Sequence, residues 1–355
     1  MNLMNTHFTF NKDTNWLKLR NGSMDWSIFQ KRSKALHEIR SFFDNHDFLE
    51  LESPILTPFP TLDNNILSVQ ADVTTLSGKC LPLYLHTSPE HTMKKYLVAG
   101  AEKIYFLGKV FRNGEITRLH NPEFTMVEWY RTQATYEDVM HDTECMIQHL
   151  FSKFNLPDQI TYSDQAINLN RPWRRVSVYT LFKEKVGIDL DEAQDVESLK
   201  KQAKHLECML TKEDDWESCF YKIFLDYIEN GLGVPEPAWV TDYPKRLGLM
   251  ARTKKHAPEY VERAELYIAG LELANGYSEL VDPVEQRARF VEDQAKKKAM
   301  GFDYPIDEEL LHALELGLPS CSGMALGFDR LFMLLTNQTS IEDVLTFPIN
   351  QFYNI

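Results

Sequence analysis

The sequence lacks the features that mark disulfide-stapled, zinc-binding and membrane proteins. Only five of its 355 residues are cysteines, and these are scattered, odd in number and without a C-x-x-C pair. We therefore expect reduced thiols, and neither a disulfide framework nor a zinc site. No stretch has the apolar length of a membrane span, and the N-terminus has no signal-peptide pattern. These absences predict a soluble, cytoplasmic protein.

Positive charge is also scarce, because 38 lysines and arginines face 52 aspartates and glutamates and the formal net charge is −14. A chain this acidic has no general attraction for phosphate backbones, so binding of a nucleic acid would need a local basic patch. The motifs G-x-x-x-x-G-K-[ST] and G-x-G-x-x-G are both absent. Their absence argues against P-loop and Rossmann-type nucleotide binding.

The sequence does contain alternating strand and helix patterns. Leu36, Ile39 and Phe43 form an apolar stripe that predicts a helix over residues 26–45, followed by a short strand that ends before Pro54. Further strands are predicted at 81–89, 103–112, 121–130, 238–242, 265–281 and 320–327, and further helices at 90–100, 136–153, 283–300, 307–316 and 328–336. Strands joined by hairpins favour an antiparallel sheet with flanking helices, which is an α+β fold.

The charge pattern also suggests how the chain is divided. Residues 1–25 are polar and aperiodic, and we expect an N-terminal extension on the surface. Residues 26–355 are expected to form one catalytic-type domain. Within that domain, residues 183–235 are rich in Asp, Glu and Lys, and they predict a mostly helical insertion.

Residues 111–124 form the first candidate cluster. Arg112 ends a predicted strand and can form a two-pronged contact with a phosphate. Phe124, on the returning strand, can offer a flat face to a purine, and loop 113–120 can fold over both. This arrangement would clamp a nucleotide. The alternative is a surface hairpin with a chance arginine.

Residues 272–279 form the second cluster. Glu272 and Glu279 are seven residues apart, an odd separation that would place them on opposite faces of a regular strand. A bulge at Gly276 would bring both carboxylates to one side. They could then hold Mg²⁺ while it bridges phosphates. The alternative is a pair of solvated acids near a glycine turn.

Residues 322–331 form the third cluster. Its small residues would let a ligand approach the backbone closely. The strand then changes into a helix that carries Arg330 in its first turn, a position suited to a phosphate or a purine face. The alternative is an ordinary strand-to-helix turn in which Arg330 pairs with Asp329.

Together these clusters resemble the three signature motifs of class II aminoacyl-tRNA synthetases. Residues 31–54 resemble motif 1, the dimer interface of that class; Phe111–Tyr130 resembles motif 2; and Gly323–Leu331 resembles motif 3. Within the class, His120–Tyr130 and Glu272–Pro283 are most similar to lysyl-tRNA synthetases. The resemblance therefore implies a class II catalytic domain and a homodimer formed through motif 1.

One subfamily resembles the sequence most: the elongation factor P–(R)-β-lysine ligases, truncated paralogues of lysyl-tRNA synthetase. Only about 30 residues precede the motif 1 segment, so we expect no anticodon-binding domain. The phrases Thr87–Glu90, Glu128–Arg131 and Glu272–Gly276 look like that subfamily's versions. Ala325 stands where lysyl-tRNA synthetases carry a glycine, and its methyl group should narrow the pocket and favour the β-isomer of lysine.

The resemblance implies a set of site residues. The catalytic residues would be Arg112, Arg330, Glu272 and Glu279, with Mg²⁺ held by the two glutamates. ATP would contact Arg112, Asn113, Gly114, Glu115, Asn121, Phe124, Glu272, Leu273, Gly327 and Arg330. The amino acid would contact Ser88, Pro89, Glu90, Tyr130, Glu279 and Ala325. Gly114 departs from the family pattern, which has an adenine-reading glutamate there, and the neighbouring Glu115 is the candidate replacement.

The resemblance also implies an activity: (R)-β-lysine reacts with ATP to give an adenylate, and the β-lysyl group passes to a lysine ε-amino group of elongation factor P. Because that partner is acidic too, we expect a basic patch near the site, with Arg118, Arg131, Arg171, Arg174 and Arg175 as candidates. Three alternatives remain open. The first is a compact lysyl-tRNA synthetase-like enzyme that charges tRNA. The second is a paralogue that converts an activated carboxylate into a free amide, and the third is an inactive regulatory protein that binds an amino acid or nucleotide.

Overall fold

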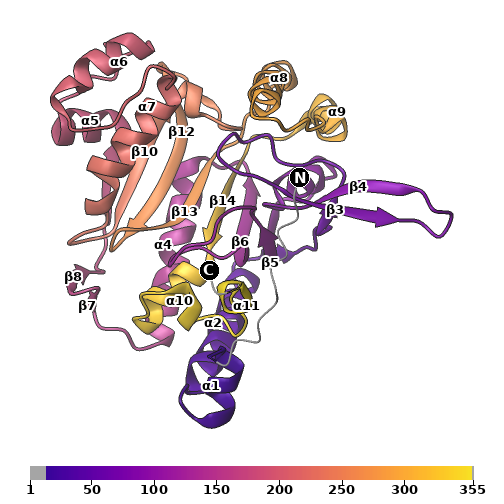
Figure 1. Ribbon diagram of the computed structural model, residues 1–355, viewed down its shortest axis with the longest axis vertical. Helices are drawn as coiled ribbons and strands as arrows, with labels where there is room; N and C mark the ends of the chain where they lie inside the picture. Colours follow the sequence, from indigo (N-terminus) through magenta and orange to yellow (C-terminus); the bar gives the residue numbers. More distant parts are fainter. Residues whose placement is uncertain (1–12, 354–355) are drawn as a thin grey trace.

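The computed structural model describes residues 13–353, and one large sheet organises them (Figure 1). The strand order is β1-β5-β6-β14-β13-β12-β10-β9, with β11 beside β12. Two pairs, β1–β5 and β9–β10, are parallel, and the other neighbours are antiparallel. The strands are β1 Leu49–Glu50, β5 Lys103–Phe111, β6 Glu123–Thr132, β9 Arg174–Ser177, β10 Ala238–Pro244, β11 Thr253–Lys254, β12 Ala257–Ile268, β13 Leu271–Ser278 and β14 Cys321–Gly327. The predicted α+β fold with an antiparallel-dominated sheet is confirmed.

One face of the sheet is fully covered by helices. The helices are α2 (Ser27–Asp44), α4 (Tyr136–Lys153) and α10 (Phe328–Thr336). Val127 and Trp129 of β6 point to this side and join the buried cluster that contains Phe43 of α2. Met126 and Tyr130 of the same strand point to the opposite side. The two-residue periodicity predicted for this strand is therefore confirmed.

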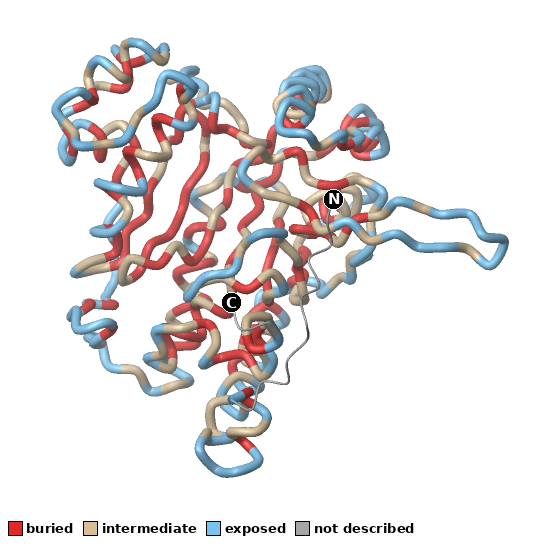
Figure 2. Tube along the Cα trace, in the orientation of Figure 1, coloured by how far each residue is buried: buried red, intermediate tan, exposed pale blue. Residues whose placement is uncertain are grey.

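The opposite face is covered only at its two ends. At one end, α3 (Glu90–Val98), α8 (Pro283–Ala299) and α9 (Glu308–Gly317) pack on β5 and β6. At the other end, α5 (Val178–Val186), α6 (Val196–Gln202) and α7 (Trp216–Ile223) pack on β10 and β12. Buried strand segments run through the middle of Figure 2, between these two groups of helices. This arrangement leaves room for a cleft over β6, β14 and β13.

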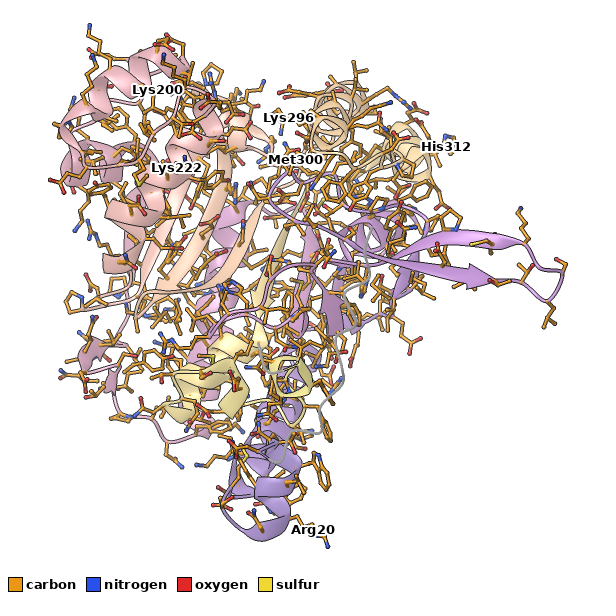
Figure 3. All side chains as sticks on the ribbon, in the orientation of Figure 1. Arg20, Lys200, Lys222, Lys296, Met300 and His312 are labelled. Carbon is orange, nitrogen blue, oxygen red and sulfur yellow. The ribbon has the colours of Figure 1, made fainter. Side chains whose placement is uncertain are left out.

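The acidic region predicted as helical does contain helices, although the first begins at Val178, directly after β9. A π-helical turn, η2 (Phe224–Ile228), follows α7. Phe182, Phe220 and Phe224 stack on one another within this region. Lys296 of α8, labelled in Figure 3, lies 2.7 Å from Glu217 of α7 and ties the region to the rest of the molecule. Its status as an insertion stays a prediction.

The N-terminal segment differs from the expected surface extension where the structure describes it; residues 1–12 lie outside the described part. Helix α1 (Asn15–Asn21) is docked against the C-terminal segment. The amide of Asn15 donates to the carbonyl oxygens of Glu342 and Leu345, each at 2.7 Å. Sequence periodicity missed this helix because it is short and held by contacts with residues more than 300 positions away.

Two smaller sheets and one hairpin were not anticipated. Strands β2 (Leu56–Thr57), β4 (Cys80–Leu85) and β3 (Val69–Thr74) form one sheet, whose β3–β4 hairpin projects from the body (Figure 1). Strands β7 (Gln159–Tyr162) and β8 (Gln165–Asn168) form the other. All five cysteines lie in the described part and are free thiols. Within residues 13–353, no helix has both the length and the apolar character needed to cross a membrane.

Candidate active site

Two adjoining cavities open on the uncovered part of the sheet. The larger has a volume of about 640 Å³ and the smaller about 130 Å³. Residues of β6, β13 and β14 form the floor of both. Arg112, Asn275 and Ala325 line both cavities, so the two form one continuous cleft.

Two arginines converge on the larger cavity. Arg112 directly follows β5, and its backbone N–H donates to the Pro122 carbonyl at 2.9 Å, which closes the hairpin. Its guanidinium lies 5.2 Å from the centre of the Phe124 ring. Its buried Nε has no hydrogen-bond partner among the described residues. Arg330, in the first turn of α10, donates to the backbone carbonyl of Glu272 at 2.8 Å. A partly exposed guanidinium with an unsatisfied Nε, in the same cavity as a second arginine, suits an anionic ligand such as a phosphate chain.

His120, which the sequence patterns did not single out, holds Arg330 in place. Burial and the positive charges of Arg330 and Arg112 lower the pKa of His120 to about 4. The ring is therefore neutral near pH 7, and its Nε2 accepts a hydrogen bond from Arg330. Its Nδ1 lies 2.8 Å from the hydroxyl of Thr117. A neutral histidine fixes the arginine without reducing the positive charge of the cavity.

Two carboxylates lie together in the larger cavity. They are Glu272 of β13 and Glu265 of β12. Burial and the charge of Glu265 raise the pKa of Glu272 to about 7, although Arg330 and Arg112 oppose the rise. Glu265 accepts hydrogen bonds from Arg263, Tyr243, Tyr267 and Asn275. In proteins Mg²⁺ is commonly held by one or two carboxylates together with substrate phosphates, so this pair fits that ion.

The predicted position of the β13 bulge is wrong. Leu266 pairs with Ala274, whereas Tyr267 pairs with Glu272, so Leu273 is the extra residue. Gly276 lies in regular pairing with its neighbours on both sides. A Cβ atom at Gly276 would overlap the Gly323 carbonyl, which explains the glycine by close strand packing. Because the bulge adds one residue, Glu272 and Asn275 both face the cleft.

Glu279 is not placed beside Glu272. It lies past the end of β13 and lines only the smaller cavity, where its Oε2 is 2.6 Å from Nζ of Lys94. The carboxylate next to Glu272 is Glu265, and nothing in the local sequence could reveal a pairing between two strands. The predicted role of Glu279 at a metal stays a prediction.

Five carboxyl groups line the smaller cavity, those of Asp63, Glu90, Glu128, Glu279 and Asp293, and three of them, Glu90, Glu128 and Glu279, repel one another. Glu128 of β6 accepts hydrogen bonds from the hydroxyls of Ser88 and Tyr130, both at 2.7 Å. Glu90, at the start of α3, accepts from Lys94 at 2.8 Å and from the Tyr277 hydroxyl at 2.5 Å. Glu279 pairs only with Lys94 among the described residues. Two of these three acids thus pair with one lysine, and the third has only hydroxyl partners.

This imbalance alters the ionisation of all three acids. Burial and the charge of Glu90 raise the pKa of Glu128 to about 7. Burial raises the pKa of Glu279 to about 8, against the opposing effect of Lys94. Burial also acts on Glu90, but Lys94 and Tyr277 outweigh it and keep its pKa below the ordinary value. A cationic ligand would relieve the repulsion among these groups, so the pocket favours an ammonium.

Most of the predicted site residues line the cleft. Ser88, Glu90, Tyr130, Glu279 and Ala325 line the smaller cavity, and the larger is lined by Arg112, Glu115, Asn121, Phe124, Glu272, Leu273, Gly327 and Arg330. Three predicted residues line neither cavity. Asn113 and Gly114 form the turn after β5, and Pro89 precedes α3. Their contacts to ATP or the amino acid stay predictions.

Asn121 lines the larger cavity, but its side chain is already occupied. The amide nitrogen donates to the Glu123 carbonyl at 2.6 Å, and the amide oxygen accepts from the Ile349 N–H at 2.9 Å. It therefore anchors the motif 2 segment to the C-terminal segment.

Five residues that the sequence patterns missed complete the site: Lys94, His120, Glu128, Glu265 and Tyr277. The Glu90–Lys94 spacing of four residues was a usable signal, because such pairs meet on one helix face. Glu128 also lies in phase with Tyr130 on one strand face. The other three contacts join segments far apart in sequence.

The predicted basic patch is not found at the cleft. Arg118 donates to the Thr339 carbonyl, Arg131 pairs with Asp142, and Arg171 pairs with Glu144. None of the five candidate arginines lines either cavity: Arg118, Arg131, Arg171, Arg174 and Arg175. Their positions follow from contacts with other segments of the chain, and the number of charged residues in the sequence does not reveal these contacts.

The antiparallel floor carries a cleft with two arginines and two carboxylates in its larger cavity and further acids in its smaller one. This arrangement is typical of the class II synthetase type of catalytic domain. The family model for tRNA synthetases class II (D, K and N) matches residues 9–351, and the chain belongs to this family. Enzymes of the family are ligases that form an aminoacyl-adenylate.

Within this family, the chain is similar to curated lysine–tRNA ligases. The chain is similar to lysine–tRNA ligases of Clostridium acetobutylicum (38% identical over 327 residues), Prochlorococcus marinus (38% over 326) and Aquifex aeolicus (39% over 324). These alignments cover 90%, 91% and 90% of this chain, but only 62%, 62% and 53% of those proteins. The chain thus spans less than two thirds of the length of these curated relatives.

Proposed function

We propose that this chain activates (R)-β-lysine with ATP and transfers the β-lysyl group to a lysine ε-amino group of elongation factor P. The observation that carries the proposal is the arrangement of charged groups along the cleft: two arginines lie beside the Glu272–Glu265 pair in the larger cavity, and a further group of acids lies in the smaller. Arg112 and Arg330 supply positive charge in the larger cavity, and Glu90, Glu128 and Glu279 supply negative charge in the smaller. A diamino acid bound across the cleft would direct its ammonium groups toward the acids and its carboxylate toward ATP.

In the first step, a carboxylate oxygen of the amino acid attacks the α-phosphorus of ATP. The new O–P bond forms as the bond to the bridging oxygen breaks, and pyrophosphate leaves. The substrate carboxylate is already ionised, so no side-chain nucleophile is needed. Arg112 and Arg330 would neutralise phosphate charge and hold the reacting groups in line. Glu272, with Glu265 beside it, would hold Mg²⁺, which supplies further neutralisation when bound.

In the second step, the neutral amine of the acceptor attacks the carbonyl carbon of the adenylate. A C–N bond forms, the C–O bond to AMP breaks, and the amine loses a proton. His120, which is neutral and lies in the larger cavity, is a conceivable acceptor of that proton. Its Nε2 already accepts a hydrogen bond from Arg330, so this bond would have to break first. Solvent is therefore the simpler proton acceptor.

Ala325 supports the β-isomer. It lies on β14 opposite Asn275 and Glu128, at the boundary between the two cavities. A methyl group there removes space beside the substrate backbone, where α- and β-lysine differ. ATP–pyrophosphate exchange with each isomer tests this assignment. Equal or faster exchange with α-lysine would reject it, and Ala325→Gly should shift the preference toward α-lysine.

The acceptor is tested separately. The likeness to lysine–tRNA ligases supports tRNA as the second candidate. Incubation with ATP and labelled amino acid, followed by mass analysis of elongation factor P and assay of charged tRNA, distinguishes the two. Label on tRNA alone would reject the protein acceptor. Absence of exchange with every amino acid would instead favour the inactive regulatory alternative, for which Gly114 is the main argument.

We also propose a homodimer through the motif 1 segment. Leu49, near the end of that segment, and Ile55 and Leu56, directly after it, are 59%, 46% and 40% exposed, which is unusual for neighbouring large apolar residues. Sedimentation of the purified chain tests this state, and a monomer at micromolar concentration would reject it.

A further inference from the structure

Lys94 of α3 is a buried cation without a part in the steps above. Its side chain is 1% exposed, and it does not line the smaller cavity. From behind that cavity, its Nζ lies 2.8 Å from Glu90 and 2.6 Å from Glu279. A lysine is rarely buried so completely unless it is paired. Here one ammonium holds two carboxylates that come from different elements.

The groups around Lys94 are nearly all acidic or phenolic. Glu90 lies on its own helix, with His91 next to it. Glu128 and Tyr130 face it from β6, and Tyr277 and Glu279 face it from β13 and the segment that follows. Cys321 begins β14 nearby. Among the described residues, no other lysine or arginine forms an ion pair with Glu90 or Glu279.

Glu279 has capacity left for a ligand. Apart from the ion pair with Lys94, neither of its carboxylate oxygens meets a well-directed donor in the described part of the chain. The side chain is 1% exposed and lines the smaller cavity. A buried carboxylate with free lone pairs normally has a partner. The missing partner fits a substrate ammonium.

We propose that Lys94 is a positioning residue that holds Glu90 and Glu279 directed into the smaller cavity and lowers the pH at which they ionise, and so sets the pH range in which the enzyme accepts a diamino substrate. This inference rests on the proposed function. Lys94 never touches the substrate; it acts by offsetting the repulsion between two anions that must both be present before an ammonium can bind. Without it, burial and mutual repulsion would keep both acids protonated up to a higher pH.

The test measures ATP–pyrophosphate exchange with Lys94→Met as a function of pH and of each substrate. We expect the KM for the amino acid to rise about 100-fold, the size expected when a buried charge loses its partner. The KM for ATP should stay near the wild-type value. The acidic limb of the pH profile for kcat/KM of the amino acid should move upward by about one pH unit or more.

Lys95 provides the matched control on the same helix. It lies 2.5 Å from Glu309 of α9 and faces away from the cavity. Lys95→Met should keep both the KM for the amino acid and the position of the acidic limb. If Lys94→Met does not fold, Lys94→Gln takes its place. Glutamine is close to lysine in size and can still donate a hydrogen bond to a carboxylate, but it carries no charge.

The outcomes separate this inference from the proposed function. Wild-type protein that exchanges neither lysine isomer would reject the proposed function itself. An active wild type, with a folded Lys94 variant whose KM and acidic limb are unchanged, would reject the positioning role alone. A lower kcat with an unchanged KM for the amino acid would also reject it, because that result would indicate a purely structural lysine.

Discussion

Glu128→Gln is the substitution whose outcome depends most directly on the site's electrostatics. Glu128 is 2% exposed, and burial with the charge of Glu90 raises its pKa from 4.5 to about 7. Ionising this carboxyl therefore costs about 3 kcal/mol more in the folded protein than in the unfolded chain. Glutamine has the same shape and never ionises, so it avoids that cost.

The direction with pH follows from the raised pKa. Below about pH 4.5 the carboxyl is protonated in both states and costs nothing. As pH rises toward about 7, the unfolded chain loses the proton first, and wild-type stability falls. We expect the free energy of unfolding of Glu128→Gln, relative to wild type, to increase by about 2 to 3 kcal/mol between about pH 5 and about pH 8.5. Denaturant titrations of the ligand-free proteins at both pH values measure this difference.

Comparing the stability difference between Glu128→Gln and wild type at two pH values cancels every effect of the substitution that does not depend on pH. The amide nitrogen of glutamine would face one of the two hydroxyl donors, Ser88 or Tyr130, at a cost of about 1 kcal/mol at every pH. Glu123→Gln is the control, because Glu123 lies on the same strand but its side chain is 53% exposed. It should show no trend. A difference between Glu128→Gln and wild type that does not change with pH would refute the electrostatic reasoning.

Three further predictions follow from the same geometry. The raised pKa values of Glu128 and Glu279, about 7 and about 8, mean that both carboxyls are protonated at low pH. The KM for the amino acid should therefore fall as the pH rises from about 6 to about 8.5. A KM that does not change with pH in exchange assays would contradict this prediction. Glu272→Gln should lower exchange by about 100-fold or more and raise the Mg²⁺ concentration needed for half-maximal rate, whereas an unchanged Mg²⁺ requirement would exclude Glu272 as a ligand. Gly276→Ala should destabilise the fold by about 3 kcal/mol or more, because its methyl group would overlap the Gly323 carbonyl, and thermal unfolding against wild type measures the loss.

The sequence predicted the elements around the cleft well because each carries a strong local signal. The helix at 27–44 has a continuous apolar stripe, and the strand at 123–132 alternates between two environments. Motifs with strict residue types located Arg112 and Arg330 for the same reason. A local sequence pattern is enough to predict a helix, a strand or a site residue when a single segment contains all the residues that define it.

The parts that could not be predicted depend on pairing between distant segments. The bulge at Leu273 is defined only by its register against Tyr267, and the partner of Glu272 is Glu265 on the neighbouring strand. Lys94 becomes important only when folding brings Glu279 to it across 185 positions of sequence. The spacing of acids along one strand suggested Glu279, and it could not reveal the register that places Glu265 beside Glu272.

The acids of the smaller cavity suggest how the cleft could select a substrate with two amino groups. The interacting carboxyls of Glu90, Glu128 and Glu279 have a single lysine among them, and each missing cation leaves an acid to be protonated or unpaired. An amino acid with one ammonium could neutralise only part of this deficit. Unpaired polar groups penalise the wrong ligand more strongly than lost apolar contact does. Selection against mono-amino acids should therefore arise from the acids left without a partner, and Glu128→Gln, by removing one of them, should weaken that selection as well as the binding of lysine.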